Sequence, residues 1–319
     1  MAAENISLSA LIRKKAFDLG FDLTGFAEAS KLEGHSEKIL SWCEAGMNGG
    51  MNYLSRDLDK RTDPRILFPG AKSVIVTGLN YYTEKSLGKP GSPVISKYAY
   101  GGNYHEIIID KLNELLKYIR SVVPSAGGKA FVDSAPLLEK AWARRAGLGW
   151  PGKHSVLINR SIGSFFFIGI LLTDIILEYD EPVTADYCGN CRLCIDSCPT
   201  GAINDNRTLD VRRCIAYQTI EQKEPMEGNF TEKSGLRIFG CDICQDACPW
   251  NERARHHNTP EFEPSSSLQN MTVEDWLRLT KEDFKRLFGN SAIGRKKYET
   301  FMKNVETVLN NPQATGSIR

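Results

Sequence analysis

Residues 188–203 read CGNCRLCIDSCPTGAI, and the spacing of the cysteines in this stretch indicates the kind of metal centre around which the chain folds. The four cysteines and the proline after them follow the spacing CxxCxxCxxxCP. In such a run, three thiolates of one tight loop bind three irons of a four-iron, four-sulfur cluster, and the fourth reaches a second cluster. The stretch therefore predicts an iron–sulfur segment with two 4Fe–4S clusters.

A second run supplies the remaining ligands. Residues 240–251 read GCDICQDACPWN, which has the spacing CxxCxxxCP but lacks an opening cysteine. Cys214, in RRCIAY, is the available replacement. Crossed ligation then predicts two sets of four: Cys188, Cys191, Cys194 and Cys248 for the first cluster, and Cys198, Cys214, Cys241 and Cys244 for the second.

Two other uses of the cysteines are less compatible with this spacing. Structural zinc sites favour CxxC pairs joined by longer spacers, and disulfides are rare where thiols are kept reduced. The ninth cysteine, Cys43, stands alone in the predicted helix SWCEAG. We interpret Cys43 as a small buried hydrophobic residue.

The amino-acid composition limits the classes of protein to which the chain can belong. The 319 residues are 41% hydrophobic and 25% charged, which is ordinary for a globular protein. The net charge of +1 excludes a broadly basic nucleic-acid binder, so any such contact has to be local. The N-terminus lacks a signal-peptide pattern, and the apolar segment 163–177 is shorter than the roughly 20 residues of a membrane span. We expect a cytoplasmic protein with no membrane contact.

The predicted fold is an α/β (α+β) N-terminal domain over residues 1–180, a small two-cluster ferredoxin-like domain over 181–255, and a short helical C-terminal tail over 256–319. Apolar runs predict strands at 73–77, 129–133, 155–158 and 165–171. Helical periodicity predicts helices at 107–122, 136–146 and 297–309, with Thr272 as the N-cap of another.

General nucleotide-binding and hydrolase motifs are absent, so polar residues at the ends of apolar segments become the candidates for a site. Asp133 ends a predicted strand before Pro136, where helix capping is the favoured explanation from the pattern alone. A catalytic acid there would need apolar neighbours, such as Phe131 and Trp142, to raise its pKa. Tyr104 and His105 carry the same ambiguity between packing and chemistry.

Several stretches together resemble the epoxyqueuosine reductase family over nearly the whole chain. They are YAYGGNYH (98–105), VDSAPLLEKAWARRAGLGWPGKHSVLIN (132–159) and the cysteine segments already quoted. The resemblance implies a tRNA-modifying oxidoreductase in which the clusters reduce the cobalt of a bound cobalamin. It also implies that Asp133 protonates the epoxide oxygen of the modified base. The stretches that line cobalamin in that family match Arg56, Lys97, Asn103, Tyr104, His105, Lys153, His154, Ser155 and Asn159.

This sequence departs from the family in two places. Asn103 stands where the family commonly has aspartate, so any role that needs a negative charge there is lost. Longer relatives continue into a helical-repeat extension, so a smaller tRNA contact is expected here. Local basic patches remain as candidates for phosphate contacts. They comprise Arg253, Arg255, His256 and His257, and Arg295, Lys296 and Lys297.

The predicted partners are tRNA carrying epoxyqueuosine and an external electron donor, and the protein is expected to act as a monomer. Two other functions remain open at this point. A reductive dehalogenase also combines cobalamin with two clusters, although such proteins are typically exported with a twin-arginine signal, which this N-terminus lacks. A non-catalytic electron-transfer protein would contain iron and sulfide but no corrinoid.

Overall fold

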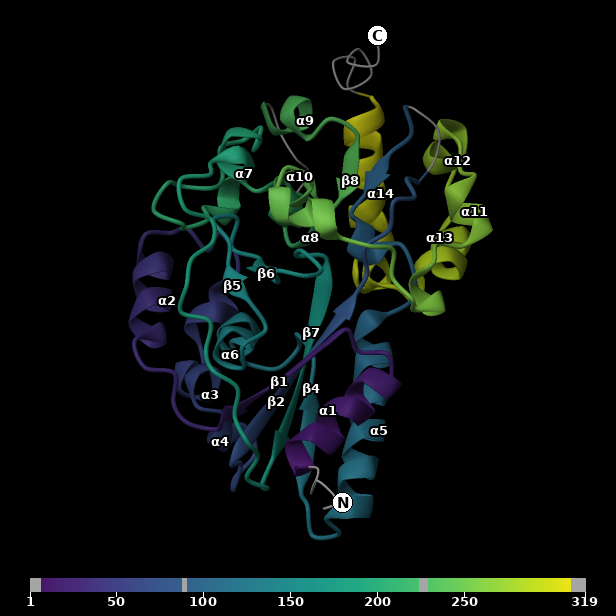
Figure 1. Cartoon of the computed structure of the whole chain (residues 1–319). Helices are drawn as coiled ribbons and strands as arrows, with labels where there is room; N and C mark the ends of the chain where they lie inside the picture. The colour runs from purple at the N-terminus through teal and green to yellow at the C-terminus, as the bar shows by residue number, and fades with distance from the viewer. Residues whose placement is uncertain (1–6, 88–90, 224–228, 311–319) are drawn as a thin grey trace.

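A four-stranded antiparallel sheet forms the centre of the larger part of the molecule (Figure 1). The computed structural model describes residues 7–87, 91–223 and 229–310. The strands lie in the order β1 (Leu23–Glu28), β2 (Ser73–Asn80), β7 (Phe166–Thr173) and β4 (Gly128–Phe131). In register, Ile75 of β2 lies between Phe26 and Leu171. The predicted mixture of helices and strands is confirmed, and all pairings in this sheet are antiparallel.

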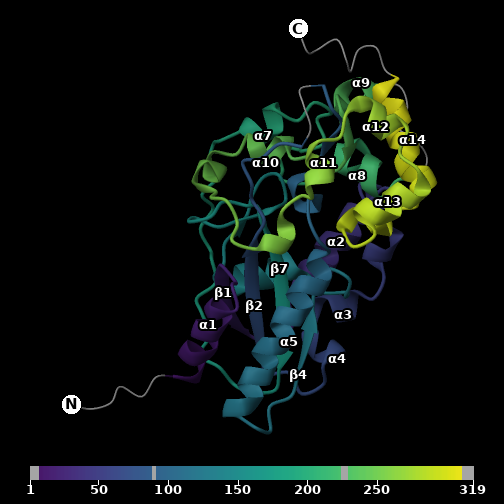
Figure 2. The same cartoon turned by 90° about the vertical axis from the view of Figure 1, so that its right-hand side faces the viewer.

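Helices cover both faces of this sheet (Figure 2). On one face lie α1 (Leu8–Asp18) and α5 (Tyr104–Val122), which pack on Ile75 and Leu171. On the other face α6 (Glu139–Arg145) packs on Val74 and Val76. This alternation along β2 follows from the two-residue period of a strand. Beyond α6 lie α2 (His35–Glu44), η1 (Asn52–Ser55), α3 (Leu58–Thr62) and α4 (Pro64–Leu67).

Two predicted strands are shorter than expected, for local reasons. The strand predicted over 129–133 ends at Phe131, because Asp133 has a positive φ of 53° that an extended strand cannot accommodate. The strand predicted over 155–158 is reduced to β6 (Leu157–Ile158), which pairs with β5 (Trp150–Pro151). Residues 153–155 form the turn between them, and Ser155 has a φ of 66°.

The predicted helices agree better, with one correction. The helix predicted over 136–146 begins only at Glu139, because Leu138 has a non-helical backbone and residues 133–138 form a loop. Gly147 follows its end with a positive φ, as predicted. The predicted helix over 107–122 is α5, which begins three residues earlier at Tyr104.

Cys43 lies in α2 as predicted, but it is half-buried, so its description as a buried hydrophobic residue was wrong.

The cysteine segment forms one end of the molecule and has few regular elements. Two short helices, α7 (Leu193–Asp196) and α10 (Ile243–Asp246), pack against each other there, each within a cysteine run. Between them the chain forms η3 (Val211–Arg213), α8 (Ile215–Ile220), α9 (Asn229–Ser234) and β8 (Arg237–Phe239). After them comes η4 (Pro249–Arg253).

The C-terminal helices complete a second hydrophobic core with residues from two earlier segments. The helix η5 (Pro260–Phe262) precedes them and packs Phe262 into the core between the sheet and α5. The helices of the second core are α11 (Ser266–Gln269), α12 (Val273–Leu277), α13 (Lys281–Phe288), η6 (Ala292–Arg295) and α14 (Tyr298–Leu309). Thr272 caps α12 through a capping box, as predicted. Their apolar faces pack on β8 and on the strand β3 (Val94–Ile95), which pairs with β8 in parallel and leads into η2 (Lys97–Ala99).

None of the helices in the described part of the chain is long and apolar enough to cross a membrane. The apolar segment 163–177 supplies β7, whose residues are almost all buried in the sheet. The N-terminal residues 1–6, on which part of the expectation about a signal peptide depended, lie outside the described residues.

Candidate active site

Asp133 and the first residues of α5 meet at the end of the sheet. Asp133 follows β4, and its Oδ2 accepts a hydrogen bond of 2.7 Å from the Tyr104 hydroxyl. His105 Nε2 lies 3.3 Å from the same oxygen. The Tyr104 ring stacks on Phe167 of β7, with 4.0 Å between ring centroids, so the sheet itself positions the hydroxyl. The predicted capping role of Asp133 is wrong, because its carboxylate binds α5 residues and not the amides of α6.

The electrostatics of Asp133 differ from the expectation. A hydrogen bond from His105, which forms only when Nε2 carries the proton, and then the hydrogen bond from Tyr104 outweigh burial and lower the pKa of the Asp133 carboxyl below its ordinary value. Burial acts to raise that pKa, as a catalytic acid there would need, but the hydrogen bonds outweigh it. Conversely, burial and the charge of Asp133 raise the pKa of Tyr104 far above its ordinary value, so its hydroxyl keeps its proton and donates it to the hydrogen bond.

Two further residues of the quoted motif 132–159 support the loop that carries Asp133. Glu139, the first residue of α6, accepts a short hydrogen bond from the backbone N–H of Asp133 through Oε1. Burial, together with the charge of Asp133, raises the pKa of Glu139 to about 8. Lys140 Nζ donates to the Ser155 carbonyl at 2.7 Å, which ties α6 to the turn between β5 and β6.

Asn103 and Arg295 contact His105 from opposite sides. Asn103 Oδ1 lies 3.1 Å from His105 Nδ1, and the same oxygen caps α5 by accepting from the His105 backbone N–H. Arg295 Nη1, from η6 near the C-terminus, lies 3.0 Å from His105 Nε2. Arg295 was predicted as a phosphate contact, but its guanidinium contacts the imidazole. These contacts bring residues 103, 104, 105, 133, 139 and 295 into one cluster.

The remaining predicted cofactor residues lie in several places. Lys97 Nζ is 2.8 Å from Asp246 Oδ1, which places Lys97 beside α10 in the cysteine segment. Lys153 Nζ donates to the carbonyls of Gly189 and Cys191, both at 2.8 Å, in the other cysteine loop. Both lysines therefore contact the segments predicted to hold the clusters.

The other four predicted cofactor residues are used differently from one another. His154 is buried, and its Nε2 lacks a hydrogen-bond partner within the described residues. Asn159 uses its amide to hold its own turn, through Leu148, Ser161 and Ile162. Ser155 is half-buried in the turn, and Arg56 is exposed next to η1.

Electrostatic effects between the cysteines of the cluster segment indicate which of them lie close together. Burial, followed by the charges of Cys188 and Cys191, raises the pKa of Cys194. The pKa of Cys248, sixty residues away in sequence, is raised by burial and by the charges of those same three cysteines. The proximity that these effects require joins the first three cysteines of one run to the last cysteine of the other.

The second set is connected in the same way. Burial and then the charges of Cys241 and Cys214 raise the pKa of Cys244 well above its ordinary value. After burial and backbone hydrogen bonds, the charge of Cys198 contributes to the raised pKa of Cys214. Cys194 of the first set also acts on Cys244, so the two sets lie next to each other.

Tyr98 lies between the cysteine segment and Asp133. Burial, then the charge of Asp242, and with smaller effect the charge of Asp133, raise the pKa of the Tyr98 hydroxyl far above its ordinary value. Asp242 directly follows Cys241. The Tyr98 ring packs on Tyr104, with 6.3 Å between centroids. A half-buried aromatic side chain therefore lies between the second cysteine run and the Asp133 cluster.

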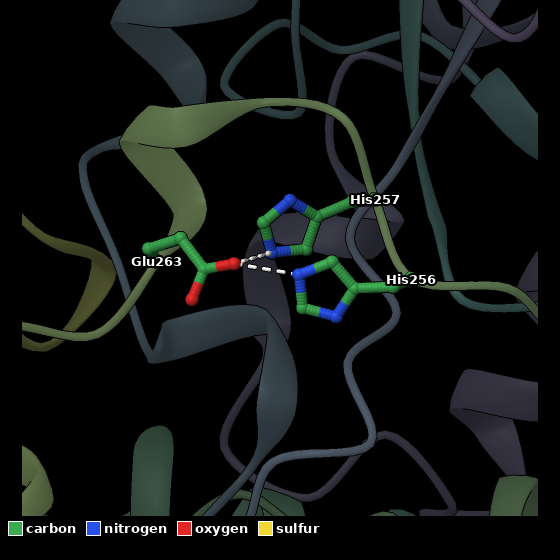
Figure 3. Close-up of side chains that lie close together, drawn as sticks. All are labelled: His256, His257 and Glu263. Atoms are coloured by element: carbon green, nitrogen blue, oxygen red, sulfur yellow. Dashed lines mark hydrogen bonds and ion pairs between the residues drawn. The ribbon is translucent and has the colours of Figure 1, made fainter.

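A pair of histidines after the cysteine segment also meets a carboxylate, as Figure 3 shows. His256 Nε2 lies 2.6 Å and His257 Nε2 3.8 Å from Glu263 Oε1. The Thr259 N–H donates to His257 Nδ1, so the hydrogen of the neutral ring is on Nε2. A protonated Nε2 cannot bind a metal, and Glu263 Oε2 already binds Lys85 at 2.7 Å. Glu263 forms an ion pair with Lys85 and both imidazole rings are turned towards its carboxylate, while the buried Nε2 of His257 has no hydrogen-bond partner within the described residues.

The other members of that predicted basic patch line an open surface cavity of about 530 Å³. Arg253 and Arg255 lie there with Arg160, which the sequence reasoning missed, and with Glu252. The guanidinium groups of Arg160 and Arg253 lie over the rings of Tyr187 and Trp250, which flank cysteine ligands in the chain. All three arginines are exposed, so the cavity presents positive charge next to the cysteine segment.

Comparisons with known proteins agree with this arrangement. Residues 187–251 match the family model of a 4Fe–4S double cluster binding domain, and residues 61–134 match that of the epoxyqueuosine reductase QueG. The chain is 44% identical over 301 residues to an epoxyqueuosine reductase of Cyclobacterium marinum, which covers 94% of this chain and 96% of that protein.

Solved structures show the same fold. A crystal structure of epoxyqueuosine reductase with an epoxyqueuosine-modified tRNA-Tyr stem loop matches with a TM-score of 0.88 at 28% identity, over 95% of this chain and 80% of that one. A Bacillus subtilis epoxyqueuosine reductase, whose catalytic aspartate loop is swung out of the active site, matches with a TM-score of 0.87 at 27% identity, over 96% and 83% of the two chains. A B12-dependent reductive dehalogenase shares the fold more distantly, with a TM-score of 0.51 at 18% identity over 82% of this chain and 34% of that one.

Proposed function

Because this chain belongs to the epoxyqueuosine reductase family, we propose that it reduces epoxyqueuosine to queuosine in the anticodon loop of tRNA. The observation that carries the proposal is the position of Asp133. Its carboxyl lies against Tyr104 and His105, and Tyr98 connects it with the cysteine segment. A proton donor next to an electron pathway is the arrangement that reductive opening of an epoxide requires.

The electron pathway is proposed to consist of two 4Fe–4S clusters with crossed ligands. Cys188, Cys191, Cys194 and Cys248 would hold the first, and Cys198, Cys214, Cys241 and Cys244 the second. Hydrogen bonds from Thr200 and backbone amides outweigh burial and lower the pKa of Cys198, which favours the thiolate that binds iron. Lys153 and Lys97 would place a positive charge beside each cluster loop. An external electron donor would reduce the clusters.

Cobalamin is proposed as the electron acceptor, and the residues around Asp133 fit such a group. Asp133 and Lys140 are exposed, so both side chains are accessible to a bound group. The nearby histidines offer cobalt no free, accessible nitrogen, since His105 Nε2 faces Arg295 and His154 Nε2 is buried. This agrees with a family whose cobalamin has no histidine ligand of the DxHxxG type. When bound, cobalamin would supply a low-potential metal centre for reduction of the epoxide carbon.

The chain's own residues would manage the protons. Conversion of the epoxide to an alkene consumes two electrons and two protons, breaks both carbon–oxygen bonds and releases water. Asp133 is proposed to deliver a proton to the epoxide oxygen from Oδ2, with Tyr104 orienting that oxygen. Glu139 is proposed to hold the Asp133 loop in place through the backbone N–H of Asp133.

The substrate would be bound partly through its phosphates. The arginine-lined cavity of Arg160, Arg253 and Arg255 presents positive charge next to the cysteine segment, and phosphate contacts dominate RNA affinity. The modified base would have to be turned out of the anticodon loop to reach Asp133, as is usual when proteins read unpaired RNA.

One assay tests the proposal directly. The chain is purified without oxygen, supplied with cobalamin and a chemical reductant, and incubated with tRNA that contains epoxyqueuosine. Nucleosides from the digested tRNA are then separated by chromatography and identified by mass spectrometry. We expect queuosine to appear in proportion to time and enzyme. If clusters and cobalamin are both bound and no queuosine forms, the proposed function is wrong.

A further inference from the structure

His105 Nε2 has two neighbours, one of which requires a lone pair on this nitrogen while the other requires a proton. Arg295 Nη1 lies 3.0 Å away, and Asp133 Oδ2 lies 3.3 Å away. A guanidinium is always charged and only donates hydrogen bonds, so the contact with Arg295 requires a lone pair on Nε2. A hydrogen bond to the Asp133 carboxylate requires a proton on the same atom. The two hydrogen bonds therefore exclude each other.

The other ring nitrogen shows which state the structure holds. Asn103 Nδ2 donates to Glu106 Oε1 at 3.0 Å, which fixes the orientation of the Asn103 amide. Its oxygen consequently faces His105, and Oδ1 lies 3.1 Å from Nδ1. Because an amide oxygen only accepts, Nδ1 carries a hydrogen. A neutral imidazole with its hydrogen on Nδ1 leaves the lone pair on Nε2 that Arg295 needs.

We propose that Arg295 is a positioning residue of the active site, which keeps His105 neutral with its hydrogen on Nδ1 and so prevents Nε2 from donating to Asp133. In that state Asp133 accepts a side-chain hydrogen bond from Tyr104 but none from His105. A carboxylate with fewer donors is a stronger base and holds a proton better, which a proton donor to an epoxide requires. The charge of Arg295 itself lowers the pKa of Asp133, but this effect is smaller than that of a hydrogen bond from His105. When Arg295 moves away, the proton can reside on Nε2 and Asp133 becomes the stabilised anion.

Few other charged groups near the imidazole would oppose a proton on His105 Nε2 as Arg295 does. Among the described residues, Tyr53 interacts with Asp133 and Arg295, and Tyr98 and Lys140 interact with Asp133. The other titratable and charged groups that face the imidazole or its partners are Tyr104, Glu106, Asp133, Glu139 and Arg295. Within this group, Arg295 is the cation in hydrogen-bonding contact with the imidazole. Removing it therefore removes the main opposition to a proton on Nε2.

The first test measures protonation of His105 without turnover. Hydrogen–deuterium exchange at the histidine Cε1 position depends on the protonation state of each ring and is followed by mass spectrometry across pH. The cluster-containing protein is compared with Arg295→Met and Arg295→Lys, and His35, on the remote helix α2, is the internal reference. In Arg295→Met we expect the His105 midpoint to rise by roughly one pH unit, with His35 unchanged. An unchanged His105 midpoint would overturn the inference.

The second test separates positioning from RNA binding and depends on the proposed function. Arg295→Met should lower kcat about tenfold, the population change that corresponds to one unit of pKa, and leave KM for tRNA nearly unchanged. Arg295→Lys keeps the charge but lacks the planar fork, so it should restore kcat only in part. A raised KM that lysine restores, with unchanged kcat, would show a phosphate contact and contradict the inference. The exchange experiment still decides the role of Arg295 if the wild type converts no tRNA.

Discussion

At the scale of single residues, Asp133 illustrates how environment decides the function of a carboxyl. Its predicted apolar neighbours lie nearby in sequence, yet the groups that reach its oxygens are the hydroxyl of Tyr104 and the imidazole of His105. Hydrogen bonding by His105, then by Tyr104, lowers the Asp133 pKa. Proton delivery from Asp133 therefore depends on how many of these donors are engaged.

Tyr104→Phe tests this dependence. Loss of the hydroxyl removes one hydrogen bond that stabilises the carboxylate, so the Asp133 pKa should rise, by up to about one unit. Because Asp133 acts in its protonated form, the alkaline limb of the pH dependence of single turnover should move to higher pH. Asp133→Asn is the matched control and should retain clusters and cobalamin but lose turnover. A Tyr104→Phe profile identical to that of the wild type would contradict the role given to the hydroxyl.

At the scale of elements, the first turn of α6 secures the loop that carries Asp133. Asp133 adopts a positive φ, which is unfavourable for a residue with a side chain, and the carboxylate of Glu139 binds its N–H in that conformation. The Bacillus subtilis relative, with its catalytic aspartate loop swung out, indicates that such a loop has a second position. The contact from Glu139 should therefore favour the inward position.

Substitutions at Glu139 distinguish an acceptor from a charge. Glu139→Gln keeps the oxygen that accepts from the Asp133 N–H and resembles the neutral form that a pKa of about 8 favours at neutral pH, so it should stay close to wild-type turnover. Glu139→Ala removes the acceptor and should lower kcat at least several-fold, since one neutral hydrogen bond contributes about 1 kcal/mol. Steady-state kinetics and protease sensitivity of residues 132–138 measure the two effects. Equal loss in both variants would mean that the negative charge is what matters.

A second contact between elements connects the end of η6 to α8. Lys296 was predicted to bind phosphate, but its Nζ donates to the carbonyls of Thr219, Ile220 and Gln222 at the end of α8. Burial lowers the pKa of Lys296 to about 8 from 10.5. Between these values the unfolded chain binds more protons, so the contribution of Lys296 to stability rises as the pH increases from 8 to 10.5.

Lys296→Met should therefore destabilise the fold by roughly 1–3 kcal/mol, because three carbonyls lose a donor. The wild type should also gain stability over this variant as the pH rises from 8 to 10.5. Chemical denaturation at several pH values measures both effects. The neighbouring exposed Lys297, changed to Met, is the control and should have little effect. A variant as stable as the wild type at every pH would show that the contacts to α8 contribute nothing.

Some helices, strands and cysteine runs could be predicted from the sequence, whereas parts of the site could not. Cysteine spacing predicted a double-cluster segment, which the family model over residues 187–251 matches, because the ligand spacing within each run is local. Periodicity located α5 and β7, since their apolar residues recur at the helical and strand periods. The loop 133–138 and the role of Arg295 could not be predicted, because Asp133 leaves the sheet through an unusual backbone angle and Arg295 meets His105 across 190 residues of chain.

At the scale of the whole molecule, cluster content depends on cysteines from both ends of the segment 188–248. Cys214→Ser should lose the second cluster and so bring the iron content down from about eight to about four per chain. Cys43→Ser is the matched control, because Cys43 lies on α2 outside both sets, and its iron content should stay unchanged. Iron and sulfide analysis with the visible absorption spectrum measures both. Full iron content in Cys214→Ser would show that another group replaces this ligand.

The last prediction concerns how the molecule recognises RNA with a net charge of only +1. Affinity then has to come from local charge, and the cavity of Arg160, Arg253 and Arg255 concentrates three arginines beside the clusters. Arg253→Gln and Arg255→Gln should each weaken tRNA binding and reduce the dependence of log Kd on log salt concentration by about one. Lys117→Gln is the control and should change neither quantity, because Lys117 lies in the C-terminal half of α5, a helix that extends away from the cysteine segment (Figure 1). The anticodon loop would thus lie over the cluster segment, and an unchanged salt dependence in both arginine variants would place the RNA elsewhere.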